Sequence, residues 1–307
     1  MQTRRDAATL GMSLLHTAYL VTTMGALTMA CAAPQPDEEL FGEAANAVVN
    51  GNALNPNALN PNALNPNALN PNALNPNALN PNALNPNSLS SAALTAITDP
   101  GTNGDLSREL LKYTVSCALS SSQSFAFSWT DSSSVTHSES YPGLLGLATG
   151  WASNALGTTG QYWVSACLAS RVNWYGVHVD ISSRGNTSQL GTTSAEITDY
   201  PYIEGAFFGN LFASTPAVYA CYNYTNISTS RVWQRDCATG HLNSNSTTSS
   251  CGMLTILGDC SNFCSAIPAY NPMYDNQYYS TCYNSTTQSE ANLVSQVVTT
   301  AVPAPWY

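Results

Sequence analysis

The fold depends on residues 158–185, TTGQYWVSACLASRVNWYGVHVDISSRG, where a helical pattern changes into a strand pattern. Thr158 and Gln161 have the spacing of a capping box, so a helix is predicted to begin just after Thr158. Gly176 is the residue type that commonly ends helices. Apolar and polar residues then alternate from 177 to 182, which predicts a half-buried strand. This helix–strand unit supplies a core but no chemistry.

The predicted helix has one wide apolar face, and a cysteine lies on it. The face is formed by Trp163, Val164, Cys167, Leu168, Ser170, Val172 and Trp174. A second helix is predicted from an N-cap at Asp105 to residue 119, and it also buries a cysteine, Cys117. Sequence does not fix disulfide connectivity, but a bridge between Cys117 and Cys167 is the pairing that we expect.

Short elements are predicted around this unit. Alternation at 125–129 and 135–141, separated by DSSS, predicts a β-hairpin. The remaining expectations are a short helix at 143–156, a helical turn at 194–199, strands at 206–212, 217–225 and 231–238, and mainly turns after Gly240. The predicted fold class is therefore α+β: a single disulfide-rich domain, residues 99–307, with two main helices, a β-hairpin and short strands.

Composition excludes several classes of partner. Charged residues make up 8% of the 307 residues, Lys occurs only at Lys112, and the formal net charge is −10 with a pI near 4.5. Without a cluster of Lys or Arg, nothing in the sequence would bind phosphate backbones or anionic lipid headgroups. We therefore expect no nucleic acid partner.

The N-terminal segment, residues 1–33, has the basic start, apolar run and small residues of an export signal. Two processing routes stay open: lipidation at Cys31, or ordinary cleavage at the A-x-A sequence around it. Residues 34–51 form an acidic linker. The predicted location is therefore outside the cytoplasm, as an outer-membrane lipoprotein or a freely secreted protein.

A repeat follows the linker and occupies residues 52–98. NALNP occurs seven times between Asn52 and Pro86, and each unit contains Asn-Pro-Asn-Ala, a turn-forming sequence. The unit resembles the Asn-Pro-Asn-Ala repeats of the malarial sporozoite coat protein, which implies a turn. One coil of a solenoid would need about twenty residues, so the seven five-residue units would make fewer than two coils, whereas such folds need about three. We expect an extended, low-complexity stalk rather than a short solenoid.

The cysteine count predicts disulfides. Nine are present, and Cys31 belongs to the export signal. The other eight are Cys117, Cys167, Cys221, Cys237, Cys251, Cys260, Cys264 and Cys282. In an exported chain an even number predicts four bridges. The alternative is a zinc site formed by Cys251, Cys260, Cys264 and His241, but the spacing lacks the tight pairs of zinc ribbons. We expect no metal and no cofactor.

Catalytic candidates are few. His178 and Asp180 share the polar face of the predicted strand, and His137 and Glu139 share a face of the hairpin, but alternation alone produces such pairs. Asp199, Glu204 and Asp236 could supply a carboxylate pair. The sequence contains no GxSxG, HExxH or phosphate-binding glycine loop. An extracellular hydrolase with a site near His178 and Asp180 is therefore the alternative prediction.

Aromatic residues favour binding instead. The chain has sixteen Tyr and six Trp, and ten of the Tyr lie among Asn and Thr residues between Tyr200 and Tyr283. Flat rings beside amides and hydroxyls are typical of glycan and protein recognition surfaces. We expect Tyr274, Tyr278 and Tyr279 to contact a glycan or a cell-surface protein. Packing of the same rings between disulfides is the alternative interpretation.

Three segments, SRELLKYTVSCAL, QYWVSACLASRVNWYGVHVDISSRG and EGAFFGNLF, together with the export signal and the repeat, resemble Cys-rich secreted proteins of myxobacteria. The resemblance covers most of residues 105–240 and implies export and a shared domain, with no activity attached. The sequence as a whole predicts a non-enzymatic surface or matrix binding module on an Asn-Pro-rich stalk.

Overall fold

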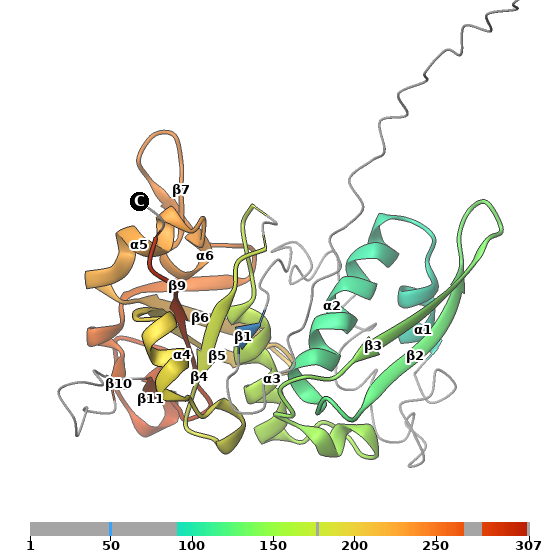
Figure 1. The fold of residues 1–307 in the computed structure, drawn as a ribbon, viewed down its shortest axis with the longest axis horizontal. Coiled ribbons are helices and arrows are strands. Elements are labelled where there is room, and N and C mark those ends of the chain that lie inside the picture. The colour runs from blue at the N-terminus through green and yellow to red at the C-terminus, as the bar shows by residue number, and fades with distance from the viewer. Residues whose placement is uncertain (1–48, 51–90, 176–177, 267–277, 306–307) are drawn as a thin grey trace, which may run out of the picture. The chain divides into compact units, whose positions relative to one another are not determined.

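The computed structural model describes residues 49–50, 91–175, 178–266 and 278–305, all within one compact unit that spans residues 39–307 (Figure 1). The export signal, Cys31, Tyr274 and most of the linker and the repeat lie outside the described residues. The mixed α+β class that the sequence predicts is confirmed.

A six-stranded sheet forms the centre of the unit, in the order β1-β4-β13-β5-β6-β9. The strands are β1 (Val49–Asn50), β4 (Ile181–Arg184), β13 (Val298–Val302), β5 (Tyr202–Asn210), β6 (Ala217–Tyr222) and β9 (Leu254–Asp259). Neighbours are antiparallel except β6 and β9, which are parallel. Every residue of β13 and all of β5 except Tyr202 are buried, so both faces of the sheet are covered.

One face of the sheet packs against α3 (Thr158–Ser170), and the other packs against a smaller sheet. Phe207 of β5 belongs to the core on the α3 side, whereas the next residue, Phe208, belongs to the opposite core. The smaller sheet, β10-β11-β12, consists of β10 (Cys264–Ala266), β11 (Tyr279–Tyr283) and β12 (Leu293–Val294). Alternate side chains of one strand therefore supply two separate cores.

On its other side α3 contacts α2 (Thr102–Ala118), and α2 contacts the hairpin strands (Figure 1). The hairpin of β2 (Ser124–Thr130) and β3 (Thr136–Pro142) is confirmed, as is the helical turn α4 (Ser194–Asp199). The remaining short elements are η3 (Thr149–Ala152), η4 (Ser188–Leu190), η5 (Tyr224–Asn226), α5 (Ile227–Val232), α6 (Asp236–Thr239), β7 (His241–Leu242), β8 (Thr248–Ser249), η6 (Cys260–Asn262) and η7 (Glu290–Asn292).

The eight cysteines outside the export signal form four disulfides: Cys117–Cys167, Cys221–Cys260, Cys237–Cys251 and Cys264–Cys282. The expected bridge between Cys117 of α2 and Cys167 of α3 is confirmed. A second contact lies beside it, because Nη1 of Arg171 donates to Oγ of Ser116 at 2.9 Å. The two long helices are thus joined by a covalent bond and a buried hydrogen bond.

Helix α3 differs from the sequence prediction at both ends. Its N-cap is Gly157, which has no side chain that could cap the helix, and Gln161 donates to the carbonyl of Leu156 instead of the capping position. The prediction of a capping box formed by Thr158 and Gln161 is therefore wrong. The helix ends at Ser170 rather than at Gly176, and the guanidinium of Arg235 donates to the carbonyl of Ser170.

Other segments also form different elements. Residues 143–156 contain only the 3-10 turn η3, and residues 231–238 form parts of α5 and α6 rather than a strand. The strand predicted from residue 177 begins at Ile181, and all of β4 is buried, including Ser182 and Arg184. After Gly240 the chain adds strands to three sheets where mainly turns were expected. In each case contacts distant in sequence override the local pattern.

The repeat is flanked on both sides by parts of the same folded unit. Residues 49–50, which the sequence places in the linker, form β1 and pair with β4. Residues 91–98, which it places in the stalk, form α1 (Ser91–Thr98), which packs against α2 and buries Ile97. The folded part therefore includes segments before and after the repeat.

A fully buried ion pair joins β5 to the segment before α6. Glu204 and Arg235 are both inaccessible to solvent, and Nη2 of Arg235 lies 2.9 Å from Oε2 of Glu204. The hydroxyls of Ser230 and Thr300 donate to the same carboxylate at 2.6 and 2.7 Å. The charge on Glu204 is thus compensated by one cation and two hydroxyl donors.

The same guanidinium ends α3. Nη2 of Arg235 donates to the carbonyl of Ser170 and Nη1 to that of Val172, both at 2.8 Å. The last carbonyl groups of a helix have no partner within the helix, and a positive charge there also stabilises the helix dipole. Arg235 therefore replaces the glycine cap that the sequence suggested.

We predict that breaking this pair is strongly destabilising. Arg235→Met or Glu204→Gln should each lower the free energy of unfolding by about 3–5 kcal/mol, because each leaves an uncompensated buried group. The double variant should cost less than the sum of the two. Urea unfolding with intact disulfides measures this, with exposed Glu290→Gln as the control. Single-variant costs below about 1 kcal/mol would contradict the role given to the pair.

The hairpin turn is held by Asp131. Its Oδ1 accepts from the amides of Ser133 and Val135 at 2.8 and 2.9 Å, and its Oδ2 lies 2.9 Å from Nε2 of His137. The hydrogen bond with His137 and those with the two amides lower the pKa of Asp131 below the ordinary value of 3.8.

A lowered pKa means that this carboxylate stabilises the turn above the ordinary value and loses that effect as pH falls through the lowered one. We predict that the amide signals of Ser133 and Val135 in NMR spectra titrate with a midpoint below 3.8. His137→Ala should move the midpoint upward, since it removes the hydrogen bond that lowers the pKa of Asp131 most. A midpoint at or above the ordinary value in the parent protein would contradict this account.

Candidate functional site

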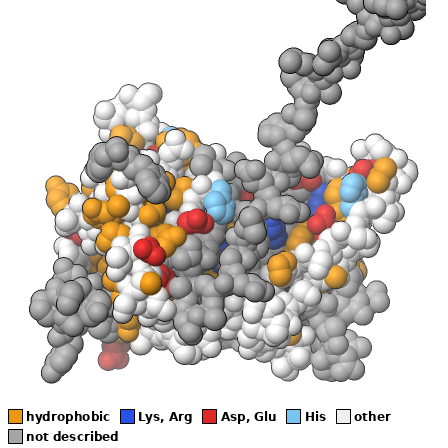
Figure 2. Space-filling model, viewed as in Figure 1, with side chains coloured by type: hydrophobic (Ala, Val, Ile, Leu, Met, Phe, Trp, Pro, Cys, Tyr) orange, Lys and Arg blue, Asp and Glu red, His pale blue; other side chains and the backbone are white. Residues whose placement is uncertain are grey.

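Two aromatic rings are exposed just after α3. Trp174 is 38% and Tyr175 48% exposed, in a turn in which the amide of Tyr175 donates to Oδ1 of Asn173 at 2.9 Å. Figure 2 shows that hydrophobic side chains are spread over the part of the surface that carries the large sheet, with little Lys or Arg beside them. Because α3 ends at Ser170, Trp174 leaves the apolar face on which the sequence placed it.

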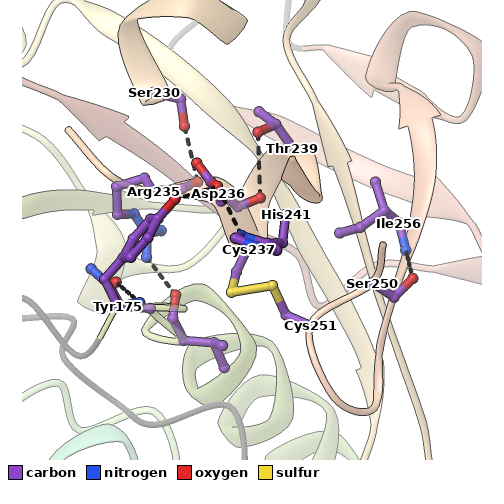
Figure 3. Close-up of a disulfide and its surroundings, with 12 residues drawn as sticks. Tyr175, Ser230, Arg235, Asp236, Cys237, Thr239, His241, Ser250, Cys251 and Ile256 are labelled. Carbon is purple, nitrogen blue, oxygen red and sulfur yellow. Dashed lines mark hydrogen bonds and ion pairs between the residues drawn. A yellow bond between two sulfur atoms is a disulfide. The ribbon is translucent and has the colours of Figure 1, made fainter. Parts of the chain in front are cut away.

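Asp236 fixes the position of Tyr175. This aspartate is the first residue of α6 and is 4% exposed. Its Oδ2 accepts from the hydroxyl of Tyr175 at 3.0 Å and lies 3.1 Å from Nδ1 of His241 (Figure 3). One buried carboxylate oxygen thus orients both a phenol and an imidazole.

His241 in turn supports Trp174. The two rings are stacked with centroids 4.0 Å apart and planes at 10°, and Tyr175 meets the same imidazole edge-on at 5.9 Å. The preceding Gly240 has φ of +79°, and a Cβ there would collide with the side chain of Thr248. We call Trp174, Tyr175, Asp236 and His241 the aromatic site.

The base of the aromatic site is held by the core. Arg235 belongs to the buried ion pair, Asp236 to the aromatic site, and Cys237 to the disulfide with Cys251 (Figure 3). Three consecutive residues therefore hold the start of α6 in place: Arg235 binds Glu204 of β5, Asp236 binds His241, and Cys237 is bonded to Cys251. Little reorganisation of this segment is needed when a ligand binds, which favours affinity.

Polar groups beside the rings remain open to a ligand. Asp236 faces Nδ1 of His241, and no described residue hydrogen-bonds to Nε2 of that imidazole, whose side chain is 17% exposed. One face of Trp174 is covered by His241, and 38% of the residue is exposed, so a ligand would stack on the part of the ring that His241 leaves open. An imidazole nitrogen and flat rings together suit a ligand with both hydroxyl groups and an apolar face.

The tyrosines that the sequence favoured have a different environment. Tyr279 is 8% exposed and packs in the core between the two sheets, so the prediction that it forms an exposed contact is wrong. The reason is that Tyr279 lies in β11, next to Cys260 and Cys282 in the same core. Tyr278 is half-buried, and Tyr274 lies outside the described residues.

The hydrolase candidates, His178 and Asp180, form a pair at the surface. Nε2 of His178 lies 3.1 Å from Oδ1 of Asp180, and the two side chains are 35% and 57% exposed. A cavity of about 220 Å³ is lined by residues between Leu147 and Gly160 and includes neither residue of the pair. Of the carboxylates considered, Glu204 and Asp236 are buried in different networks.

The cysteines of the zinc alternative are bound elsewhere. Cys251 pairs with Cys237, Cys260 with Cys221, and Cys264 with Cys282, so they offer no thiolate to a metal in this structure. His137, the other histidine considered, bonds to Asp131 and stacks on Trp129 with centroids 4.5 Å apart. Its strand neighbour Glu139 accepts from the indole of Trp129 at 3.0 Å.

Comparisons with protein-family models, curated proteins and solved structures found no match to this chain. The resemblance to Cys-rich secreted proteins of myxobacteria therefore stays a prediction. Among the described residues, none of the helices has the length and apolar character needed to cross a membrane.

Sequence reasoning found the members of the aromatic site separately but not together. Trp174 was placed on a buried helix face, Asp236 among carboxylate candidates and His241 in the zinc alternative. The signal that could have found Trp174 and Tyr175 is the doublet of large aromatics between Asn173 and Gly176, at the point where a turn follows a helix. Nothing local links them to residues 236 and 241.

The hydroxyl of Tyr175 provides a test of this geometry. Its pKa is raised above the ordinary value of 10.0, first by burial and then by the hydrogen bond to Asp236 and the negative charge of that carboxylate. We predict that Asp236→Asn lowers the pKa of Tyr175 toward 10, because the substitution removes the charge. NMR titration of protein labelled at the tyrosine ring carbons, assigned with Tyr175→Phe, measures it. An unchanged or higher pKa would contradict the contact.

Proposed function

We propose that this chain is an exported, disulfide-stabilised binding module, not an enzyme, and that the aromatic site contacts neutral glycans. The observation that carries the proposal is the exposure of Trp174 and Tyr175 on a base fixed by Asp236 and His241. Sugars bind to such rings through their apolar faces while hydroxyls bond to neighbouring polar groups.

Two features of the chain support export. Residues 1–33 have the composition of an export signal, and four disulfides are characteristic of oxidising compartments. If Cys31 is lipidated, the module is held at an outer membrane; if the signal is cleaved without lipidation, it is secreted. A glycan-rich cell surface or matrix is available in either case.

A neutral ligand fits the charges of the module. The whole chain has eight Lys and Arg residues, and the arginine adjacent to the site, Arg235, is fully buried against Glu204. The carboxylate of Asp236 would repel an acidic sugar, and anionic ligands usually require Arg or Lys partners. Neutral hexose or N-acetylhexosamine units are therefore the class that we propose.

The hydrolase alternative receives less support from the described residues. The contact between Asp236 and Nδ1 of His241 resembles the orienting half of a catalytic triad. However, no hydroxyl or thiol among the described residues hydrogen-bonds to Nε2 of His241. This imidazole contacts Asp236, through Nδ1, and the rings of Trp174 and Tyr175. His178 and Asp180 also lie on an exposed surface.

We predict that Trp174→Ala weakens binding to an insoluble neutral polysaccharide at least tenfold, because it removes the stacking face. Tyr175→Phe keeps the ring and should bind almost as well as the parent protein. The matched control is Tyr224→Ala, since Tyr224 is 71% exposed and outside the aromatic site. Cellulose, chitin and a β-glucan, tested by pull-down isotherms, provide the measurement.

Several outcomes would contradict the proposal. Equal binding of the parent protein and Trp174→Ala would exclude the aromatic site, and loss of binding in Tyr278→Ala alone would return the contact to the region that the sequence favoured. Release of soluble sugars by the parent protein, abolished by His178→Ala, would establish the hydrolase. Near-ultraviolet circular dichroism of each variant confirms that it folds.

A further inference from the structure

Two disulfides are in contact through one sulfur atom of each at the core between the two sheets. Sγ of Cys221, bonded to Cys260, lies 3.4 Å from Sγ of Cys264, bonded to Cys282. The Sγ atoms of Cys221, Cys264 and Cys282 all lie within 4.8 Å of one another. We call these four residues the four-sulfur site. The other two disulfides make no such contact among the described residues.

Access to the site is limited to one member. Cys221, Cys260 and Cys282 are fully buried, whereas Cys264 is partly exposed. Cys264 faces Cys282 across the β10–β11 pair and is joined to Cys260 by the turn η6. Cys264 is therefore the member at which a thiol in solution would enter the site, and its sulfur contacts Sγ of Cys221 in the other disulfide.

We propose that the four-sulfur site is a thiol–disulfide exchange site that takes low-molecular-weight thiols as substrates and passes the exchange from one disulfide to the other. Exchange needs a thiolate close to a disulfide sulfur, and the contact between Cys264 and Cys221 supplies that proximity once Cys264 is free.

The steps balance as follows. A thiolate RS⁻ attacks Sγ of Cys264, the bond to Cys282 breaks, and Sγ of Cys282 leaves with the electron pair and takes a proton. A second RS⁻ attacks the R sulfur of the mixed disulfide, which forms RSSR and releases the thiolate of Cys264.

That thiolate then attacks Sγ of Cys221. The Cys221–Cys264 bond forms, the Cys221–Cys260 bond breaks, and Cys260 leaves and is protonated. In total two RSH are oxidised to RSSR, and the protein gains two electrons and two protons. It retains one disulfide, Cys221–Cys264, and carries thiols at Cys260 and Cys282. The crosslink thus moves without being lost.

The last step can be tested without a reductant. Cys282→Ala leaves Cys264 as a free thiol against the Cys221–Cys260 disulfide, so the thiol should redistribute between Cys264 and Cys260. After incubation at pH 8, acid quenching, denaturation and alkylation, peptide mapping should find a Cys221–Cys264 bond and alkylated Cys260 in at least a tenth of the molecules. Incubation at pH 5 should slow the change more than tenfold, because only the thiolate attacks.

The matched control is Cys117→Ala, which frees Cys167 next to no second disulfide among the described residues. Its thiol should stay at Cys167. Alkylation confined to Cys264 in Cys282→Ala over several hours would overturn the proposal, and so would equal scrambling in the control.

If Cys282→Ala does not fold, the parent protein decides. Brief treatment with reduced glutathione, quenched at the stage where two thiols have appeared, should yield some Cys221–Cys264 crosslink. The proposal would be overturned if every two-thiol molecule opened at this site retained either Cys221–Cys260 or Cys264–Cys282 and none contained Cys221–Cys264. Neither experiment depends on glycan binding, so failure here leaves the proposed function untouched.

Discussion

The buried pair of Glu204 and Arg235 constrains the rest of the structure. Two charges without solvent contact are tolerated only where every lone pair and proton has a partner. Here the partners come from β5, β13, the end of α5 and the last turn of α3. These elements must therefore be in place together, which ties the sheet and the helix above it into one cooperative arrangement.

The network around Glu204 and Arg235 also makes the aromatic site rigid. The residues on either side of Asp236 are held in place, Arg235 by an ion pair and Cys237 by a disulfide. The carboxylate that orients Tyr175 and His241 is therefore fixed in position, although Tyr175 lies at the surface. The early end of α3 has the same origin, because Arg235 binds the carbonyl of Ser170. A core interaction thus ends α3 before Trp174, so this residue lies in the turn after the helix.

Local patterns predicted the elements that depend on local contacts. The β2–β3 hairpin, the helices around Cys117 and Cys167, and their disulfide follow from alternation, periodicity and burial of cysteine. The large sheet did not follow, since β4 and β13 are more than a hundred residues apart and β4 buries Ser182 and Arg184. The aromatic site needed residues 174, 175, 236 and 241 to meet, and only the tertiary fold brings them together. Buried polar groups whose partners are distant have no local signature.

The position of β1 has a consequence for the repeat. Because Asn50 pairs with β4 and α1 packs on α2, the Asn-Pro units connect two points of one folded unit instead of separating that unit from a membrane. Lengthening a flexible loop twofold costs only about 0.6 kcal/mol of closure entropy. Adding or deleting copies of the unit would therefore change the free energy of closure little, so the two anchored ends leave the number of repeats free to vary.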